Sequence, residues 1–369
     1  MKPVRIGIVG VGDISKIYLE NITNMFKEIE VIGVCDLVRE KAERAVEKYG
    51  IPKLYHDMYE LFADDEVDLV LNITRPYEHY GVSGAALKAG KHVYSEKPLA
   101  ATLEEGRELV RLAEEKGLFL GGAPDTFLGA GIQTCRKLID DGFIGTPVGA
   151  AAFMICRGHE SWHPDPAFYY QHGGGPMMDM GPYYLTALVN LLGGVKTVAG
   201  MTKASYPTRT ITSAPLNGTV VPVEVPTYVT GIMQFESGAI GTIFTTFDVH
   251  YDSQARLEIY GSKGTLIVPD PNCFGGPIKL LRPEQGEYRE IPLMFPYADN
   301  SRALGLADAA KAISTGRAPR CSCKQTYHVL EIMQSFRKSS ESGRFVTLES
   351  SFTRMPPMRD DLLAGVLDD

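Results

Sequence analysis

The first 36 residues constrain the fold of this chain more than any other stretch. An apolar run, Val4–Val9, leads into a glycine-containing turn at 10–15, and apolar residues then recur at helical spacing as far as Met25. A second short apolar run, Val31–Cys35, stops at Asp36. This order of strand, glycine turn, helix, strand and acidic residue predicts a βαβ unit that binds a dinucleotide.

Each position in this unit has a specific task. Gly10 can adopt the backbone angles of a tight turn, and Gly12, which lacks a Cβ, lets the backbone approach a pyrophosphate closely. The start of the helix, at Asp13 and Ile14, presents N–H groups and the positive end of the helix dipole to that pyrophosphate. Asp36 follows about 20 residues later, where it would accept hydrogen bonds from the hydroxyls of an adenosine ribose.

Three side chains bear on the choice of cofactor and on the packing of the turn. Asp36 favours NAD, because its charge would repel the 2′-phosphate of NADP, whereas the nearby Arg39 leaves NADP as an alternative. Ser15 replaces the third glycine of the usual G-x-G-x-x-G pattern, and serine is small enough for the close helix–strand packing that this position requires. The stretch therefore predicts an NAD site.

Two loops of the first 120 residues carry further candidates. Strands alternate with helices here, which predicts a parallel, doubly wound sheet whose ligand lies outside the carboxyl ends of the strands. One loop runs from Thr74 to His79, and the other begins Glu96-Lys97-Pro98. We expect both loops to face the crevice that contains the glycine turn. A lysine there can hydrogen-bond a substrate hydroxyl and stabilise an alkoxide, although the tripeptide alone also fits a solvated surface turn.

The second half of the chain has a different order of expected strands and helices. Strand-like segments follow one another with little helix between them, and turns such as Ser237-Gly238 separate them in the manner of hairpins. This pattern predicts an α+β domain on a large, mostly antiparallel open sheet. The expected strands are 148–155, 197–203, 228–235, 239–247, 256–260 and 264–268, and the expected helices are 129–140, 176–192, 304–315 and 325–339.

The predicted fold class is therefore α/β, with an N-terminal Rossmann domain followed by this α+β domain. The expected division is 1–122 for dinucleotide binding, 123–354 for substrate binding and oligomerisation, and 355–369 for a tail that is either an arm or disordered. Residues 228–233 alternate without giving a strongly polar face, so both faces of the sheet need a cover. We infer a homodimer or homotetramer in which subunits pack sheet to sheet.

The predicted helix that starts at Pro176 contains a second group of candidates. Asp179 and Tyr183 are four residues apart, so they would share one face of that helix. A carboxylate and a phenol on one face could hold a polyol hydroxyl and move its proton, provided that a cation such as Lys97 makes the phenol a better base. The alternative is an aspartate that only complements the helix dipole, beside a core tyrosine.

The segment from Arg157 to His172 holds the third group. It contains the single tryptophan, Trp162, and three of the eight histidines. Aromatic rings combined with hydrogen-bonding groups suit a sugar ring, so we expect Arg157, Trp162 and His163 to bind substrate. The histidines His159, His163 and His172 could instead bind zinc, but no helical His-Glu-x-x-His motif supports a metal site, and none is predicted.

Composition excludes several classes of protein. The formal net charge is −8 and basic residues are not clustered, which argues against nucleic-acid binding. No apolar run reaches the roughly 18 residues of a membrane span, and the N-terminal apolar run is too short and too rich in glycine for a signal peptide. The six cysteines are scattered and form no C-x-x-C pair, which favours reduced thiols in the cytoplasm.

These motifs together resemble the Gfo/Idh/MocA family, named for glucose–fructose oxidoreductase, inositol dehydrogenase and a rhizopine-catabolism protein. The resemblance covers nearly the whole chain and is carried by the glycine turn, by Glu96-Lys97-Pro98 and by the segment 179–183. It implies a Rossmann domain joined to an α/β domain with an open sheet. It also implies that Lys97 is the catalytic lysine and that Asp179 orients the substrate. The chain departs from many members at Tyr183, where they have an acid/base histidine, and resembles glucose–fructose oxidoreductase and the dihydrodiol dehydrogenases in having tyrosine.

The expected activity is hydride transfer between NAD(P) and a secondary hydroxyl or keto group of a sugar, cyclitol or related polyol. Lys97 and Tyr183 would handle the proton, while Asp179 and His163 would hold neighbouring hydroxyls. One alternative is an NAD-dependent glycoside hydrolase, which some members of the family are. Another is a non-catalytic NAD-binding sensor, but a sensor has no need of proton-transfer groups in the crevice.

Overall fold

The computed structural model describes residues 2–250 and 256–368. The chain forms two compact units that interleave along the sequence. The first contains Met1–Ala130, Met294–Tyr327 and Met355–Asp369, and the second contains Gly131–Leu293 and His328–Arg354. The three-part domain division expected from the sequence stays a prediction.

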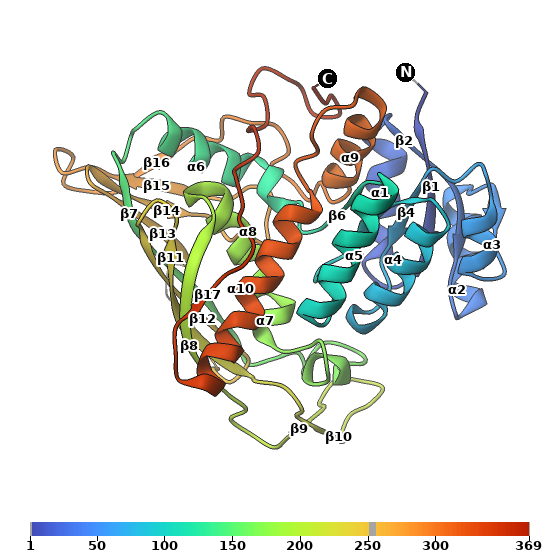
Figure 1. Ribbon diagram of the computed structural model, residues 1–369, viewed down its shortest axis with the longest axis horizontal. Coiled ribbons are helices and arrows are strands. Elements are labelled where there is room, and N and C mark those ends of the chain that lie inside the picture. The colour runs from blue at the N-terminus through green and yellow to red at the C-terminus, as the bar shows by residue number, and fades with distance from the viewer. Residues whose placement is uncertain (1, 251–255, 369) are drawn as a thin grey trace. The chain divides into compact units, whose positions relative to one another are not determined.

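The first unit is built on a parallel sheet with the strand order β3-β2-β1-β4-β5-β6 (Figure 1). Strand order reverses between β1 and β4, and ligands of such sheets bind at that reversal, outside the carboxyl ends of the strands. The predicted doubly wound parallel sheet is confirmed. Its strands are β1 (Val4–Val9), β2 (Ile29–Cys35), β3 (Lys53–Leu54), β4 (Leu69–Asn72), β5 (His92–Ser95) and β6 (Leu120–Gly122).

The helices of this unit begin and end where local chemistry requires. In α5, the Thr102 side chain accepts a hydrogen bond from the Glu105 N–H in a capping box, and Gly117 ends the helix in the left-handed conformation. The α-helices are α1 (Ser15–Asn24), α2 (Arg39–Tyr49), α3 (Met58–Ala63), α4 (His79–Lys88), α5 (Leu103–Lys116) and α9 (Leu304–Thr315), with short 3₁₀ turns at η1 (Pro76–Glu78) and η2 (Thr126–Leu128).

Strand β6 corrects one expectation. The sequence places a strand at 118–120 and a boundary at Gly121-Gly122, but both glycines lie inside the strand. A Cβ at Gly121 would lie 1.9 Å from the carbonyl oxygen of Cys321, and one at Gly122 would lie 2.3 Å from that of Ser95. The backbone of Cys321 and that of Ser95 therefore lie directly against these two positions, and only glycine fits there.

The C-terminal tail packs against the first unit. Met358 and Leu367 are buried, and the Gly365 N–H donates to the Tyr297 hydroxyl at 3.0 Å. Of the two alternatives expected for this tail, an arm or a disordered segment, the structure shows the arm for residues 355–368.

The second unit is built on a large sheet with the order β16-β15-β14-β13-β7-β12-β11-β8-β17. In the part of the chain that the structure describes, β7 and β12 are the one parallel pair of neighbours in this sheet, so the predicted mostly antiparallel sheet is confirmed. The strands are β7 (Pro147–Ile155), β8 (Val195–Lys203), β11 (Tyr228–Phe235), β12 (Ile240–Thr246), β13 (Leu257–Gly261), β14 (Gly264–Val268), β15 (Ile278–Leu281), β16 (Arg289–Ile291) and β17 (Val346–Thr347), with a separate hairpin of β9 (Thr208–Thr210) and β10 (Val220–Pro222).

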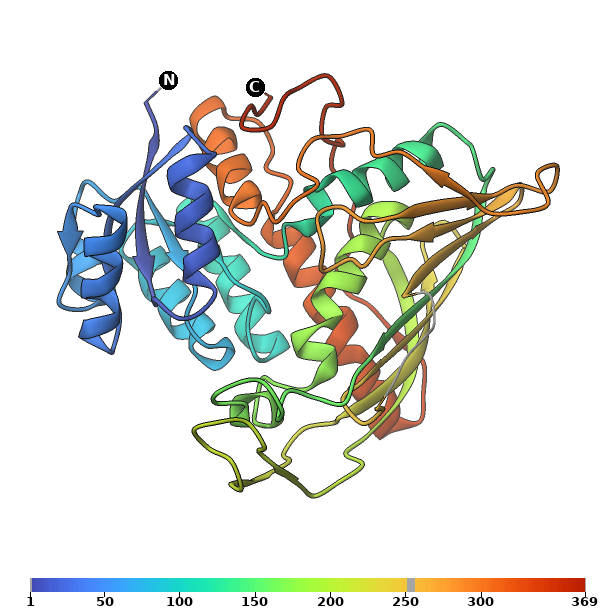
Figure 2. The ribbon, with the colours of Figure 1, turned by 180° about the vertical axis from the view of Figure 1, so that it is seen from behind.

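Helices pack on one side of this sheet (Figure 2). Gly200 of β8 and Gly231 of β11 are direct partners, and the Phe336 ring lies so close that a Cβ on either would come within 2.8 Å of it. The two glycines thus make the hollow that receives this ring. The helices are α6 (Ala130–Asp140), α7 (Pro176–Asp179), α8 (Gly181–Leu192) and α10 (Cys323–Ser342), with a 3₁₀ turn at η3 (Ala167–Tyr170).

The single helix expected over 176–192 is wrong. The structure has two helices, α7 and α8, with a break at Met180 (φ −106°, ψ −25°). Pro182 explains the break, because it has no N–H to donate to the carbonyl four residues earlier and its ring crowds that carbonyl. Asp179 and Tyr183 therefore do not share one face of a continuous helix. Among the described residues, no helix is both long enough and apolar enough to cross a membrane.

Candidate functional site

The glycine turn has the shape that a pyrophosphate site requires. Gly10 has φ +92°, and a Cβ there would lie 3.0 Å from the carbonyl oxygen of Ile73, so conformation and space both demand glycine. A Cβ at Gly12 would meet no described atom within 4 Å. The first glycine thus closes the turn against β4, and the second leaves room in front of the backbone.

The start of α1 is arranged to receive an anion. Ser15 is buried, and its hydroxyl donates to the Gly12 carbonyl at 2.6 Å, so this serine replaces the third glycine without disturbing the packing. Within the described residues, no side chain caps the helix at Ile14 and its first turn contains no acidic residue. The positive end of the helix dipole is therefore available for a phosphate.

Asp36 is fixed by backbone N–H groups on both sides. One carboxylate oxygen accepts from the Val11 N–H at 2.6 Å, and the other accepts from the Val38 N–H at 2.7 Å. Each oxygen can accept a further hydrogen bond, so the carboxylate remains suited to ribose hydroxyls. Arg39, which left NADP as an alternative, pairs with Glu43 at 2.9 Å. The N–H groups at the start of α1, the Asp36 carboxylate and the open turn at Gly12 together fit NAD.

His79 links the two loops that follow β4 and β5. It is 1% exposed; its Nδ1 lies 2.7 Å from the Pro98 carbonyl and its Nε2 lies 3.1 Å from the Thr74 carbonyl. Burial lowers the pKa of His79. A neutral imidazole can donate to only one of these carbonyls. The structure thus places His79 as a buried connection between the loops, while direct contact of Thr74 or His79 with a cofactor stays a prediction.

Glu96 holds the backbone at Lys97. One of its carboxylate oxygens accepts from the buried Tyr18 hydroxyl of α1 at 2.8 Å, and the other accepts from the Lys97 N–H at 2.9 Å. Burial, together with the nearby Glu96 carboxylate, raises the pKa of Tyr18 well above its usual range, so this phenol is a donor. The Lys97–Pro98 peptide bond is cis, as the sequence allowed, and Lys97 is half-buried. The lysine therefore stands on a fixed turn at the carboxyl end of β5.

Asp179 lies at the end of the one-turn helix α7 in the second unit. Its side chain is mostly buried, and one carboxylate oxygen lies 3.5 Å from Nε2 of His159. Tyr183, in the first turn of α8, is buried. Asp179 and Tyr183 thus belong to the second unit, whereas Lys97 belongs to the first.

An aromatic cluster surrounds His159, in the segment predicted to bind substrate. Its ring stacks on Tyr169 with centroids 3.8 Å apart and lies 5.3 Å from the ring of Trp162, which is 62% exposed. The ring of His163 is 5.5 Å from that of Trp162, and its Nδ1 accepts from the Asp165 N–H at 3.0 Å. The exposed indole beside hydrogen-bonding side chains suits a sugar ring.

Arg157, also predicted to bind substrate, contacts an aromatic ring. The Arg157 guanidinium lies over the Tyr206 ring at 5.4 Å. The sequence placed His159 and Tyr169 in the segment expected to suit a sugar ring, but it predicted neither their stacking nor a contact of His159 with Asp179. The approach of His159 to Asp179 depends on a loop with no periodicity, so no sequence signal could have found it. Within the residues that the structure describes, no group of three or more His, Cys, Asp or Glu side chains is arranged to hold a metal ion.

The fold and the glycine turn define a class of protein. A parallel sheet of order 3-2-1-4-5-6, with a glycine turn after its first strand and an acid after its second, is a dinucleotide-binding Rossmann domain. The family model "Oxidoreductase family, NAD-binding Rossmann fold" matches residues 4–122, and the model "GFO/IDH/MocA C-terminal domain" matches residues 132–267. The chain belongs to the Gfo/Idh/MocA family of NAD-binding oxidoreductases.

Relatives and solved structures agree with this assignment. The chain is 25% identical to the myo-inositol 2-dehydrogenase of Thermotoga maritima over 94% of its own length and 99% of the relative. It is 24% identical to the scyllo-inositol 2-dehydrogenase (NAD(+)) of Bacillus subtilis, with 86% and 88% covered. A levoglucosan dehydrogenase in complex with NADH has the same fold, with a TM-score of 0.81 at 20% identity over 94% of this chain and 100% of that one.

Proposed function

We propose that this protein is an NAD-dependent dehydrogenase that oxidises a secondary hydroxyl of a sugar, cyclitol or related polyol, or reduces the corresponding ketone. The observation that carries the proposal is Lys97, held by Glu96 at the carboxyl edge of a sheet whose first turn is shaped for a dinucleotide. The named activities of the relatives support this substrate class, since two of them act on inositols.

Each candidate side chain has a role in this proposal. The Lys97 ammonium donates a hydrogen bond to the reacting oxygen and stabilises it as an alkoxide, and the Tyr183 hydroxyl exchanges the proton. Asp179 accepts a hydrogen bond from a neighbouring hydroxyl, while Trp162 and His163 hold the sugar ring. When bound, NAD supplies the hydride acceptor. The remaining contacts proposed for the nucleotide and the substrate are those of Gly10, Gly12, Asp13, Ile14, Asp36, Thr74, His79, Glu96 and Arg157.

A screen of sugars, cyclitols and other polyols with NAD tests this function. Absorbance of the reduced nicotinamide is followed, and the organic product is identified by mass spectrometry. We expect one group of polyols to give NADH and the corresponding ketone in equal amounts. Glycoside cleavage without net NADH would instead indicate an NAD-dependent hydrolase. A protein that takes up NAD but turns over no polyol, and that binds a partner protein, would indicate a sensor.

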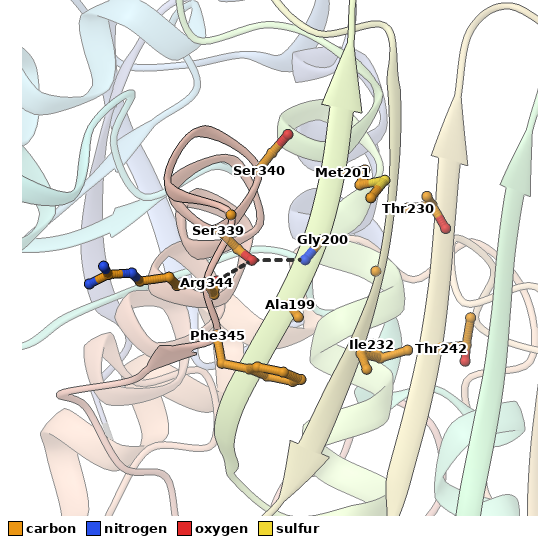
Figure 3. Close-up of a pocket in the computed structure, with 12 residues that line it drawn as sticks. Ala199, Gly200, Met201, Thr230, Ile232, Thr242, Ser339, Ser340, Arg344 and Phe345 are labelled. Atoms are coloured by element: carbon orange, nitrogen blue, oxygen red, sulfur yellow. Dashed lines mark hydrogen bonds between the residues drawn. The ribbon is translucent and has the colours of Figure 1, made fainter.

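The outer face of the large sheet supports the proposed self-association. Met201, Ile232 and Phe345 are large, exposed apolar side chains there, and a groove of about 430 Å³ runs between them (Figure 3). Ser339 closes one side of this groove, because its hydroxyl accepts from the Gly200 N–H and donates to the Arg344 carbonyl. Contiguous exposed apolar surface on a sheet is typical of a protein interface. We infer that a second copy of this chain covers it.

Ile232→Glu is expected to dissociate the oligomer, because it places a charge in the centre of that face. Size-exclusion chromatography with light scattering would show a smaller mass than for the wild type. Tyr59→Glu, at an exposed aromatic residue of α3 in the other unit, is the matched control and should leave the mass unchanged. A monomeric wild type, or an Ile232→Glu variant with unchanged mass, would contradict the inferred interface.

The six cysteines are free thiols, and the cytoplasmic location proposed on that basis stays a prediction.

A further inference from the structure

His159 is held in one orientation by aromatic rings from separate parts of the second unit. The imidazole stacks on Tyr169 at 3.8 Å and meets the edge of Phe247 at 4.7 Å. Its backbone carbonyl accepts from the His163 N–H at 3.0 Å. The neighbouring Glu160 pairs with the buried Arg209 at 3.1 Å, which fixes the loop on the other side. The ring therefore has little freedom to rotate.

The two ring nitrogens of His159 have different surroundings. Nε2 lies 3.5 Å from a carboxylate oxygen of Asp179, whereas Nδ1 is buried and has no hydrogen-bond partner among the described residues. A proton on Nδ1 would be a buried donor without an acceptor, which is unfavourable, whereas a bare Nδ1 only leaves a lone pair unused. The arrangement therefore favours the tautomer that carries its proton on Nε2 and donates toward Asp179.

Asp179 lies on a helix that is too short to fix its side chain by itself. α7 is a single turn that ends at Asp179, and the chain breaks at Met180 before α8 begins. The orientation of the carboxylate must therefore come from contacts outside α7. His159, which the loop after β7 delivers, is one such contact.

We propose that His159 is a positioning residue: its Nε2–H holds the Asp179 carboxylate in the orientation that accepts a hydrogen bond from a substrate hydroxyl. This inference rests on the proposed function, because it assigns Asp179 a substrate to orient. The donor at Nε2 carries the effect, and the aromatic contacts keep that donor in place. Glutamine and asparagine carry the same amide donor at different distances from the backbone. Substituting each for His159 therefore separates the effect of the donor at Nε2 from the effect of lost ring packing.

The experiment compares three substitutions at one site. His159→Gln can place an amide donor near the position of Nε2, His159→Asn can place one only near Nδ1, and His159→Ala removes both. With the polyol found in the screen, we expect the Asn and Ala variants to lose about 10- to 100-fold in kcat, the range that a misplaced substrate group costs. The Gln variant should recover most of that loss, and the KM for NAD should stay unchanged in all three.

The controls distinguish a failed inference from a failed function. His172→Gln, at an exposed histidine of the same segment, should behave as wild type. Equal losses in the Gln and Asn variants, or wild-type kcat in all three, would overturn the positioning role while leaving the dehydrogenase intact. Nitrogen-15 NMR of the His159 ring in the wild-type protein shows which ring nitrogen carries the proton. This result depends neither on activity nor on how the variants fold. A proton on Nε2 supports the inference, and a proton on Nδ1 alone overturns it, even if the wild type oxidises no polyol.

Discussion

Lys97→Met is expected to lower kcat for polyol oxidation by about 10²-fold or more, the scale of a lost acid/base group, while NAD affinity changes little. Methionine keeps the unbranched, apolar part of the lysine stem in a half-buried position and removes only the ammonium. The backbone of residue 97 should hold its place, because Glu96 accepts from the N–H of that residue and from Tyr18. Steady-state kinetics and titration of protein fluorescence with NADH measure the two quantities separately.

Lys88→Met is the matched control for this experiment. Lys88 lies on the same Rossmann unit, is exposed at the end of α4 and takes no part in the proposed site. Its substitution should leave both kcat and NADH affinity at wild-type values. Near-wild-type kcat in the Lys97 variant would refute its proposed part in proton transfer. Loss of NADH binding in step with kcat would assign the lysine to the cofactor instead.

The Rossmann unit was predictable because its signals are local. Each helix or strand is marked by its own periodicity, and the chirality of βαβ units then leaves few arrangements for the sheet. The turn at Gly10 could be predicted because it needs glycine. Residues with a side chain rarely adopt φ +92°, and a Cβ there would lie 3.0 Å from a carbonyl oxygen. The path of β6 was missed because its two glycines look like a boundary, and only the backbone of residue 321 explains them.

The second unit was less predictable because its decisive contacts are not local. Nothing in the pattern marks β15 or the two edge strands, β16 and β17, which are short or only half-buried. His159 and Asp179 are 20 residues apart and come together through an irregular loop. The return of 294–327 and 355–368 to the first unit is also invisible in the sequence, because it depends on contacts whose partners have no fixed spacing. These are hydrogen bonds such as those from the Ala303 and Gly305 N–H groups to Asp125, and buried ion pairs that join the two returning segments.

Asp308 is the centre of those ion pairs. It is fully buried on α9, where one carboxylate oxygen accepts from both Arg317 and Arg320 at 2.7 Å and the other accepts from the Arg320 N–H at 2.8 Å. The Arg320 guanidinium continues to Asp368 at 2.6 Å and donates to the carbonyls of residues 356 and 357. Asp308 and Asp368 thus share two arginines, and Arg320 joins α9 to the C-terminal arm.

Asp308→Ala is expected to destabilise the protein by about 3 kcal/mol, the lower end of the cost of removing one partner of a buried ion pair, because Asp368 still pairs with Arg320. Urea unfolding followed by circular dichroism measures this, and the melting temperature should fall by roughly 4 °C. Asp308→Leu combined with Arg320→Met should recover part of the loss, because the double variant removes the more deeply buried guanidinium together with its partner, while Arg317 keeps its pair with Asp368. Asp361→Ala, which breaks an exposed pair with Arg359 in the same arm, should have no measurable effect. Equal destabilisation of the Asp308→Ala variant and of the double variant would mean that packing around residue 308, and not the charge of Asp308, holds the arm.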